Sequence, residues 1–156
     1  MVDLKEVIIH ASRKGEVGVL EELMGLKVDV NTRDEKGYTP LIIACYNGKA
    51  AAAAYLLSMG AHVDAQDNGG NTALMGAAFK GYLEIAELLI RHGASLNLQH
   101  GNGGTALMFA AMFGRNEVLQ LLLAQGADKS IRDARGLLAV DLARQQNNSE
   151  GALLLE

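Results

Sequence analysis

The sequence predicts an all-α solenoid of five helix-turn-helix units with short β-turn or hairpin tips. Three observations predict this fold: a 33-residue repeat, short apolar stretches with helical spacing, and glycine-bearing turns between them. One helix pair of this length buries too little surface to fold alone, so neighbouring units must stack to complete a continuous core. The repeat runs in one register through four sets of residues: Thr39, Thr72 and Thr105; Leu41, Leu74 and Leu107; Ala44, Ala77 and Ala110; Gly48, Gly81 and Gly114.

Each full unit begins with a tight turn and a first helix. The turns DEKG, DNGG, HGNG and DARG have Asp or Gly where tight turns favour them. The repeated threonine suits the N-cap of the first helix, and the mid-unit glycine suits a left-handed C-terminal cap. A second helix follows, as in YLEIAELLIRHG, where Leu83, Ala86 and Leu89 have helical spacing.

The units divide a single domain, residues 1–156, into the approximate segments 1–33, 34–66, 67–99, 100–132 and 133–156. The first unit lacks the leading turn but keeps two helices, and the last has a shortened second helix. In the second unit, Ala50–Ala54 replaces the usual mixture of apolar and charged residues. Because alanine favours helix, the helix should still form. Two of the five alanines should face the next unit, and others should leave an uncharged convex patch.

The second unit, DEKGYTPLIIACYNGKAAAAAYLLSMGAHVDAQ, resembles the ankyrin repeat. That family's signature combines an Asp-x-x-Gly turn, Thr-Pro-Leu-His, paired alanines, a mid-unit glycine, Leu-Leu and Gly-Ala-Asp-Val-Asn. The resemblance extends over nearly the whole chain. The signature histidine is replaced by Ile42, Met75 and Met108, so these units should depend more on apolar packing. His100 also replaces the turn aspartate of the fourth unit.

Composition argues against several classes of partner. The net charge of −4 argues against electrostatic binding of nucleic acid or anionic lipid, and no apolar run approaches the length of a membrane span. The N-terminus lacks the basic and apolar regions of a signal peptide, which favours a cytoplasmic location. A periplasmic or secreted protein stays open if a signal peptide has been removed. The single cysteine excludes an internal disulfide framework.

No residue set predicts catalysis, so we expect a non-enzyme without cofactor or metal. The histidines, His10, His62, His92 and His100, lack the spacing of metal ligands. The GNGG and DNGG segments are repeat turns, and neither has the Gly-Lys-Ser/Thr end of a phosphate loop. Cys45 occupies a paired-alanine position, where a small buried residue is expected, and this favours core packing over a nucleophile.

Stacking in one register aligns equivalent positions along the solenoid. The resemblance implies that the two residues after each small pair lie at the end of the inner helix, on the concave face. The predicted partner-binding residues there are Arg13, Lys14, Tyr46, Asn47, Phe79, Lys80, Met112 and Phe113, with Tyr82 extending the row and Tyr38 and Asn71 at the turn tips. Aromatic residues are 4% of the chain and most fall on this surface, which favours binding. The alternatives are that some rings pack into the core and that the tip residues serve the turns.

The resemblance implies protein–protein interaction without catalysis. The size suggests a monomeric adaptor, or an inhibitor of an enzyme or toxin, that binds another protein through the concave face and turn tips. The small size and the methionine-rich TALM segments look more like bacterial ankyrin proteins than eukaryotic scaffold fragments. The alternative is a structural or self-associating protein that uses the convex alanine patch or the C-terminal end.

Overall fold

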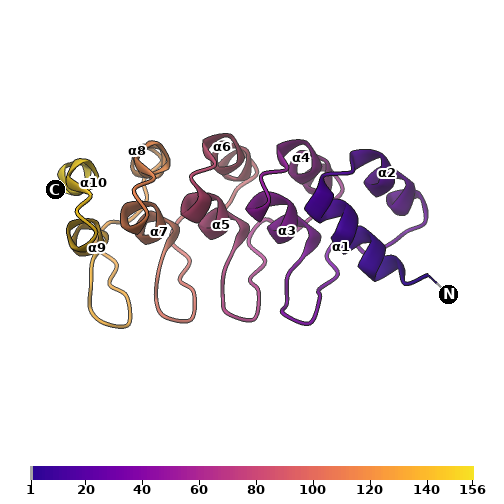
Figure 1. The fold of residues 1–156 in the computed structure, drawn as a ribbon, viewed down its shortest axis with the longest axis horizontal. Helices are drawn as coiled ribbons and strands as arrows, with labels where there is room; N and C mark the ends of the chain where they lie inside the picture. The colour runs from indigo at the N-terminus through magenta and orange to yellow at the C-terminus, as the bar shows by residue number, and fades with distance from the viewer. Residues whose placement is uncertain (1) are drawn as a thin grey trace.

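The computed structural model describes residues 2–156, which form ten α-helices and no strand. The helices form two layers, and long turns project from the inner layer (Figure 1). The inner layer contains α1 (Leu4–Lys14), α3 (Pro40–Tyr46), α5 (Ala73–Lys80), α7 (Ala106–Met112) and α9 (Ala139–Gln145). The outer layer contains α2 (Val17–Gly25), α4 (Ala50–Ser58), α6 (Leu83–Arg91), α8 (Asn116–Ala124) and α10 (Ser149–Leu155). The predicted all-α solenoid is confirmed, with tips formed by hydrogen-bonded turns. No helix within residues 2–156 is long and apolar enough to cross a bilayer.

Three inner helices, α3, α5 and α7, begin directly after the predicted threonines and end one or two residues before the predicted glycines. The hydroxyl oxygens of Thr39, Thr72 and Thr105 each accept a hydrogen bond from the backbone amide three residues later, at 3.2–3.3 Å. At the end of α5, Gly81 has a φ of 78°, which is the left-handed conformation expected of a glycine cap. The three helices with threonine caps have seven or eight residues, whereas α1 has eleven.

The core lies between the two helix layers and between successive units. The small pairs that follow the repeated leucine are fully buried, so the inner helices can approach closely. Ile42, Met75 and Met108 are also buried, as expected where apolar side chains replace the signature histidine. In α4, Ala52 and Ala53 are buried, so two of the five alanines belong to the core. That they face the next unit stays a prediction.

A polar ladder, which was not predicted from the sequence, joins the turns. One side chain from each of three units donates hydrogen bonds to a carbonyl of the turn that follows it and to the carbonyl 33 residues further along the chain. For example, Gln66 Nε2 donates to Gly70 O at 2.7 Å and to Gln99 O at 3.3 Å. The side chains that do so recur every 33 residues: Arg33, Gln66 and Gln99. Because each bond crosses a unit boundary, the ladder fixes the register of the stack.

The turn tips are also joined directly by their backbones. Asn68 N donates to Lys36 O at 3.0 Å, Gly101 N to Gly69 O at 2.8 Å, and Ala134 N to Asn102 O at 2.9 Å. In the fourth unit, His100 Nδ1 accepts from the Gly104 amide at 2.9 Å. The imidazole therefore takes the place of one of the aspartate hydrogen bonds in the other turns.

Cys45 is fully buried at the end of α3, and burial raises the pKa of its thiol from 9.0 to about 12. Since the thiolate is the reactive species, we expect a disulfide reagent to label native protein at pH 8 only through unfolding. Labelling should become fast in urea, as measured by release of a chromophore. The unfolded chain ionises this thiol at a lower pH than the folded protein does, so ionisation favours unfolding. The contribution of the neutral Cys45 thiol to stability is therefore complete below about pH 9 and is lost as the pH rises toward about 12. Rapid labelling of the native protein would contradict core packing of Cys45.

Candidate functional site

Three rings from consecutive units form a continuous row at the ends of the inner helices. We call Tyr46, Phe79 and Phe113 the aromatic row. The Tyr46 and Phe79 rings are stacked with centroids 6.1 Å apart, and Phe79 meets Phe113 edge-on at 4.6 Å. Tyr46 is 45% exposed and Phe113 is 42% exposed, whereas Phe79 between them is half-buried. The two outer rings of the row are therefore exposed on the surface, and the central ring packs against both of them.

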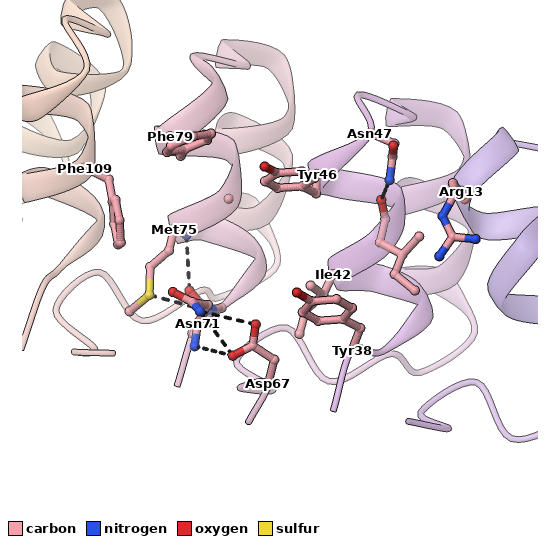
Figure 2. A pocket seen from close by; sticks show the side chains of 13 residues that line it. Arg13, Tyr38, Ile42, Tyr46, Asn47, Asp67, Asn71, Met75, Phe79 and Phe109 are labelled. Atoms are coloured by element: carbon pink, nitrogen blue, oxygen red, sulfur yellow. Dashed lines mark hydrogen bonds between the residues drawn. The ribbon is translucent and has the colours of Figure 1, made fainter. Parts of the chain in front are cut away.

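A solvent-open cavity of about 430 Å³ lies beside the aromatic row, and we call it the hollow. Tyr46 and Phe79 border one side of it, Tyr38 and Asn71 border the tip side, and Phe109 closes one end (Figure 2). Six of the predicted binding residues line it: Arg13, Tyr38, Tyr46, Asn47, Asn71 and Phe79. The structure thus brings the predicted helix-end and tip residues together around one cavity.

The floor of the hollow includes Gly76, which the sequence analysis did not single out. The positions 33 residues before and after it are Ile43 and Phe109, whose side chains also line the cavity. A Cβ built on Gly76 would lie 3.5 Å from Tyr46 Cδ1. The missing side chain leaves the space open. In the sequence, this space is indicated by a glycine inside a predicted helix at a position where both adjacent units have large residues.

A second cavity, of about 440 Å³, lies on the other side of Phe109. Phe109 lines both cavities and meets the His100 ring edge-on at a centroid distance of 5.2 Å. Met112 and Arg135 also line this second cavity, so Met112 lies beside the aromatic row and outside the hollow. Of the two adjacent residues predicted for this surface, Phe113 meets the Phe79 ring and Met112 lines the second cavity.

The remaining predicted residues lie at the edges of this surface. Lys14 is exposed at the end of α1. Tyr82 is half-buried and packs over Gly48 of the preceding unit, where a Cβ would lie 3.2 Å from its Cζ. Lys49 and Arg115 pack in the same way over the equivalent glycines of their preceding units. Tyr82 therefore belongs to this second row, next to the outer helices, and a role for it in binding stays a prediction.

The unpaired charge around the hollow is positive. Lys80 Nζ lies 4.6 Å from the Tyr46 ring centroid, a cation–π contact. Within residues 2–156, no carboxylate lies within 4.0 Å of Arg13, Lys14 or Lys80. The hollow does contain Asp67, but its carboxylate accepts bonds from the Asn71 side chain and from the amides of the turn. Several carboxylates lie instead on the outer helices, at Glu21, Glu22, Glu84, Glu87 and Glu117.

The groups that the described residues offer at this surface are apolar, amide and cationic. No group of three or more His, Cys, Asp or Glu side chains within residues 2–156 is placed to hold a metal ion. The lone thiol is buried away from the hollow, with its pKa raised by burial. What the hollow presents is aromatic and aliphatic surface bordered by cations and amides.

Comparison with known proteins identifies the repeat. The family described as "Ankyrin repeats (3 copies)" matches three overlapping stretches, residues 8–100, 70–133 and 93–155. Together these stretches extend from residue 8 to residue 155. No curated protein matches the chain.

Proposed function

The chain belongs to the ankyrin repeat family, and on that premise we propose that it binds a partner protein through its concave face and turn tips. Ankyrin repeats are in general protein–protein interaction modules without catalytic activity. The observation that carries the proposal is the aromatic row, in which rings from three units contact one another and two of them, Tyr46 and Phe79, line the hollow. Exposed aromatic side chains next to a pocket are typical of the residues that dominate binding energy at protein interfaces.

The stacked scaffold supports binding by limiting the entropy lost on docking. The polar ladder and the tip bonds hold neighbouring units in register. The rings contact one another in the free protein, so their positions are largely set before a partner arrives. A surface ordered in advance loses less conformational entropy than a flexible one.

We propose further that the protein is a non-catalytic adaptor or inhibitor. An inhibitor would cover the active surface of an enzyme or toxin. This requires a rigid, extended interface, and the inhibitor itself needs no catalytic residues. The hollow and the aromatic row provide apolar contacts, and Asn47, Asn71 and the unpaired cations provide polar contacts around them. No metal, cofactor or nucleic acid enters this proposal.

Replacing Phe113 by alanine tests the proposal. The ring is 42% exposed and contacts one neighbouring ring, so the free energy of unfolding should fall by only about 0.5–1.5 kcal/mol. Binding to the captured partner should weaken by about 2 kcal/mol or more. The partner is first captured from an extract of the source organism on immobilised wild-type protein, and its affinity for each variant is then titrated.

The matched control is Leu153→Ala, which removes an apolar side chain that is 71% exposed on the outer helix α10. This variant should bind the partner as the wild type does. If Leu153→Ala loses the partner while Phe113→Ala keeps it, binding through the concave face is wrong.

The alternative function is self-association, and the exposure of Leu153 is the observation that favours it. In that case two copies would meet through α10 or through the alanine patch on α4. Light scattering over a range of concentrations separates the two functions. A mass that stays monomeric opposes self-association, and a mass that rises with concentration and falls in Leu153→Ala supports it.

A further inference from the structure

We propose that the hollow takes one large apolar side chain from an acidic, extended segment of the partner. This inference rests on the proposed function, because it names the chemistry that the concave face recognises. Three features carry it: the open space at Gly76, the apolar walls of the hollow, and the unpaired cations around it.

The space at Gly76 is not explained by folding requirements. Its backbone does not have the positive φ that favours glycine. A Cβ at this position would make only ordinary contact, at 3.5 Å, with the Tyr46 ring. Alanine would fit there and would favour the helix more than glycine does. The effect of the glycine on the structure is to open the hollow between Ile43 and Phe109.

The walls of the hollow suit a large apolar side chain. Ile43 and Met75 contribute aliphatic and thioether surface near Gly76, and the Tyr46 and Phe79 rings border the opening. The volume of about 430 Å³ admits a leucine, methionine or phenylalanine side chain while the ligand backbone stays outside. On the tip side, Tyr38 offers a hydroxyl group to an extended backbone (Figure 2).

The charge around the hollow selects an acidic segment. Arg13 lines the hollow from α1, and the Lys80 ammonium lies over the Tyr46 ring from α5. Neither has a carboxylate within 4.0 Å in the described chain, so each is free to pair with a ligand carboxylate. The one lining carboxylate, Asp67, is held by hydrogen bonds of its own turn. Acidic residues on both sides of the apolar anchor would therefore meet both cations.

A protein segment fits this surface better than a nucleic acid. A nucleic acid would offer anionic phosphates to the same cations, and its bases could stack on the rings. The hollow, however, is lined mainly by aliphatic and aromatic residues, among them Ile42, Ile43 and Met75, and these suit an apolar side chain better than the hydrogen-bonding edge of a base. An oligonucleotide is therefore the competing ligand in the test.

The test is selection of a random peptide library on the immobilised full chain, followed by titration of the enriched peptides in solution. We expect the enriched peptides to share a net negative charge and one large apolar position. Gly76→Leu, which fills the hollow, and Arg13→Glu and Lys80→Glu, which reverse its charge, should each weaken binding about tenfold or more. Raising the salt from about 0.1 M to 1 M, which shortens the Debye length from about 10 Å to 3 Å, should also weaken it.

Two control variants match the site variants in kind. Gly18→Leu adds the same side chain at an exposed position of α2, where a Cβ would meet nothing within 4 Å. Arg91→Glu reverses a charge in the last turn of α6, and Arg13 likewise lies in the last turn of α1. Both controls should bind as the wild type does. Gly76→Ala, which should fold at least as well as the wild type, serves if Gly76→Leu does not fold, and it should also weaken binding.

The outcomes separate this inference from the proposed function. If the enriched peptides are neutral or basic and bind Phe113→Ala more weakly than the wild type, the acidic ligand is wrong and binding at the concave face is still supported. Peptides that bind every concave variant as they bind the wild type would overturn both. The inference is also wrong if no peptide is enriched, or if a single-stranded oligonucleotide of the same charge binds as tightly as the peptides.

Discussion

Gly103→Ala is expected to lower the free energy of unfolding by about 2–5 kcal/mol, because two costs add at this position. Gly103 has a φ of 83°, and a side chain in this left-handed conformation costs about 1–2 kcal/mol. A Cβ there would lie 2.8 Å from Ala134 N and 3.0 Å from Asp133 Cα. Both atoms belong to the backbone of the next tip, so relief requires the tips to separate. That movement would strain the 2.9 Å bond from Ala134 N to Asn102 O. Urea denaturation measures the loss.

Gly136 provides the matched control for this prediction. It is the equivalent residue of the last unit, it has the same φ of 83°, and a Cβ there would meet nothing within 4 Å. Gly136→Ala should therefore cost only the backbone term, about 1–2 kcal/mol. The difference between the two variants measures the close approach of the tips. Equal losses would mean that the tips are not packed as the structure has them.

Phe79→Ala is expected to have the largest effect on partner binding, about 3 kcal/mol or roughly a hundredfold. Phe79 is the central ring of the aromatic row, so its loss removes the contacts that position both Tyr46 and Phe113. The free energy of unfolding should also fall, by about 1–3 kcal/mol, because a half-buried ring and two aromatic contacts are lost. Calorimetric titration of the captured partner measures binding, and urea denaturation measures stability.

Leu121→Ala separates the two effects of the Phe79 substitution. Leu121 is half-buried on the outer helix α8 and packs against the core away from the row. Its truncation should also cost about 1–3 kcal/mol in stability while leaving binding unchanged. If both variants lose the same affinity, binding depends on overall stability and the row has no special role.

The repeat made most of the fold predictable. Residues that recur every 33 positions identify the caps, the buried small pairs and the turns, and threonine and glycine have local reasons to occupy their positions. The burial of Ile42, Met75 and Met108 also followed from the pattern, because apolar residues replaced a polar one at an inward position. Local propensity and periodicity were sufficient for these features.

The candidate site was predictable only in part. Register aligned Tyr46 and Phe79 with Met112 and placed Phe113 one position further along, whereas only the structure shows that Phe113 meets the Phe79 ring. Six of the predicted residues meet at the hollow. Periodicity did not predict that Tyr82 would pack over Gly48 or that Phe109 would separate two cavities. Those features depend on side-chain direction and on contacts with the adjacent unit. The 33-residue repeat shows which positions are equivalent, but it gives neither of these.

The sequence by itself determined that this protein is a stack of helix pairs, because each unit carries its own caps, turn and apolar face. Only the tertiary structure decided which contacts and which binding surface the stack forms. The polar ladder through Gln66, the tip contact at Gly103 and the hollow at Gly76 each involve atoms from at least two units. The physical reason is that caps and periodicity act within a unit, whereas a binding surface on a solenoid forms from the gaps between units.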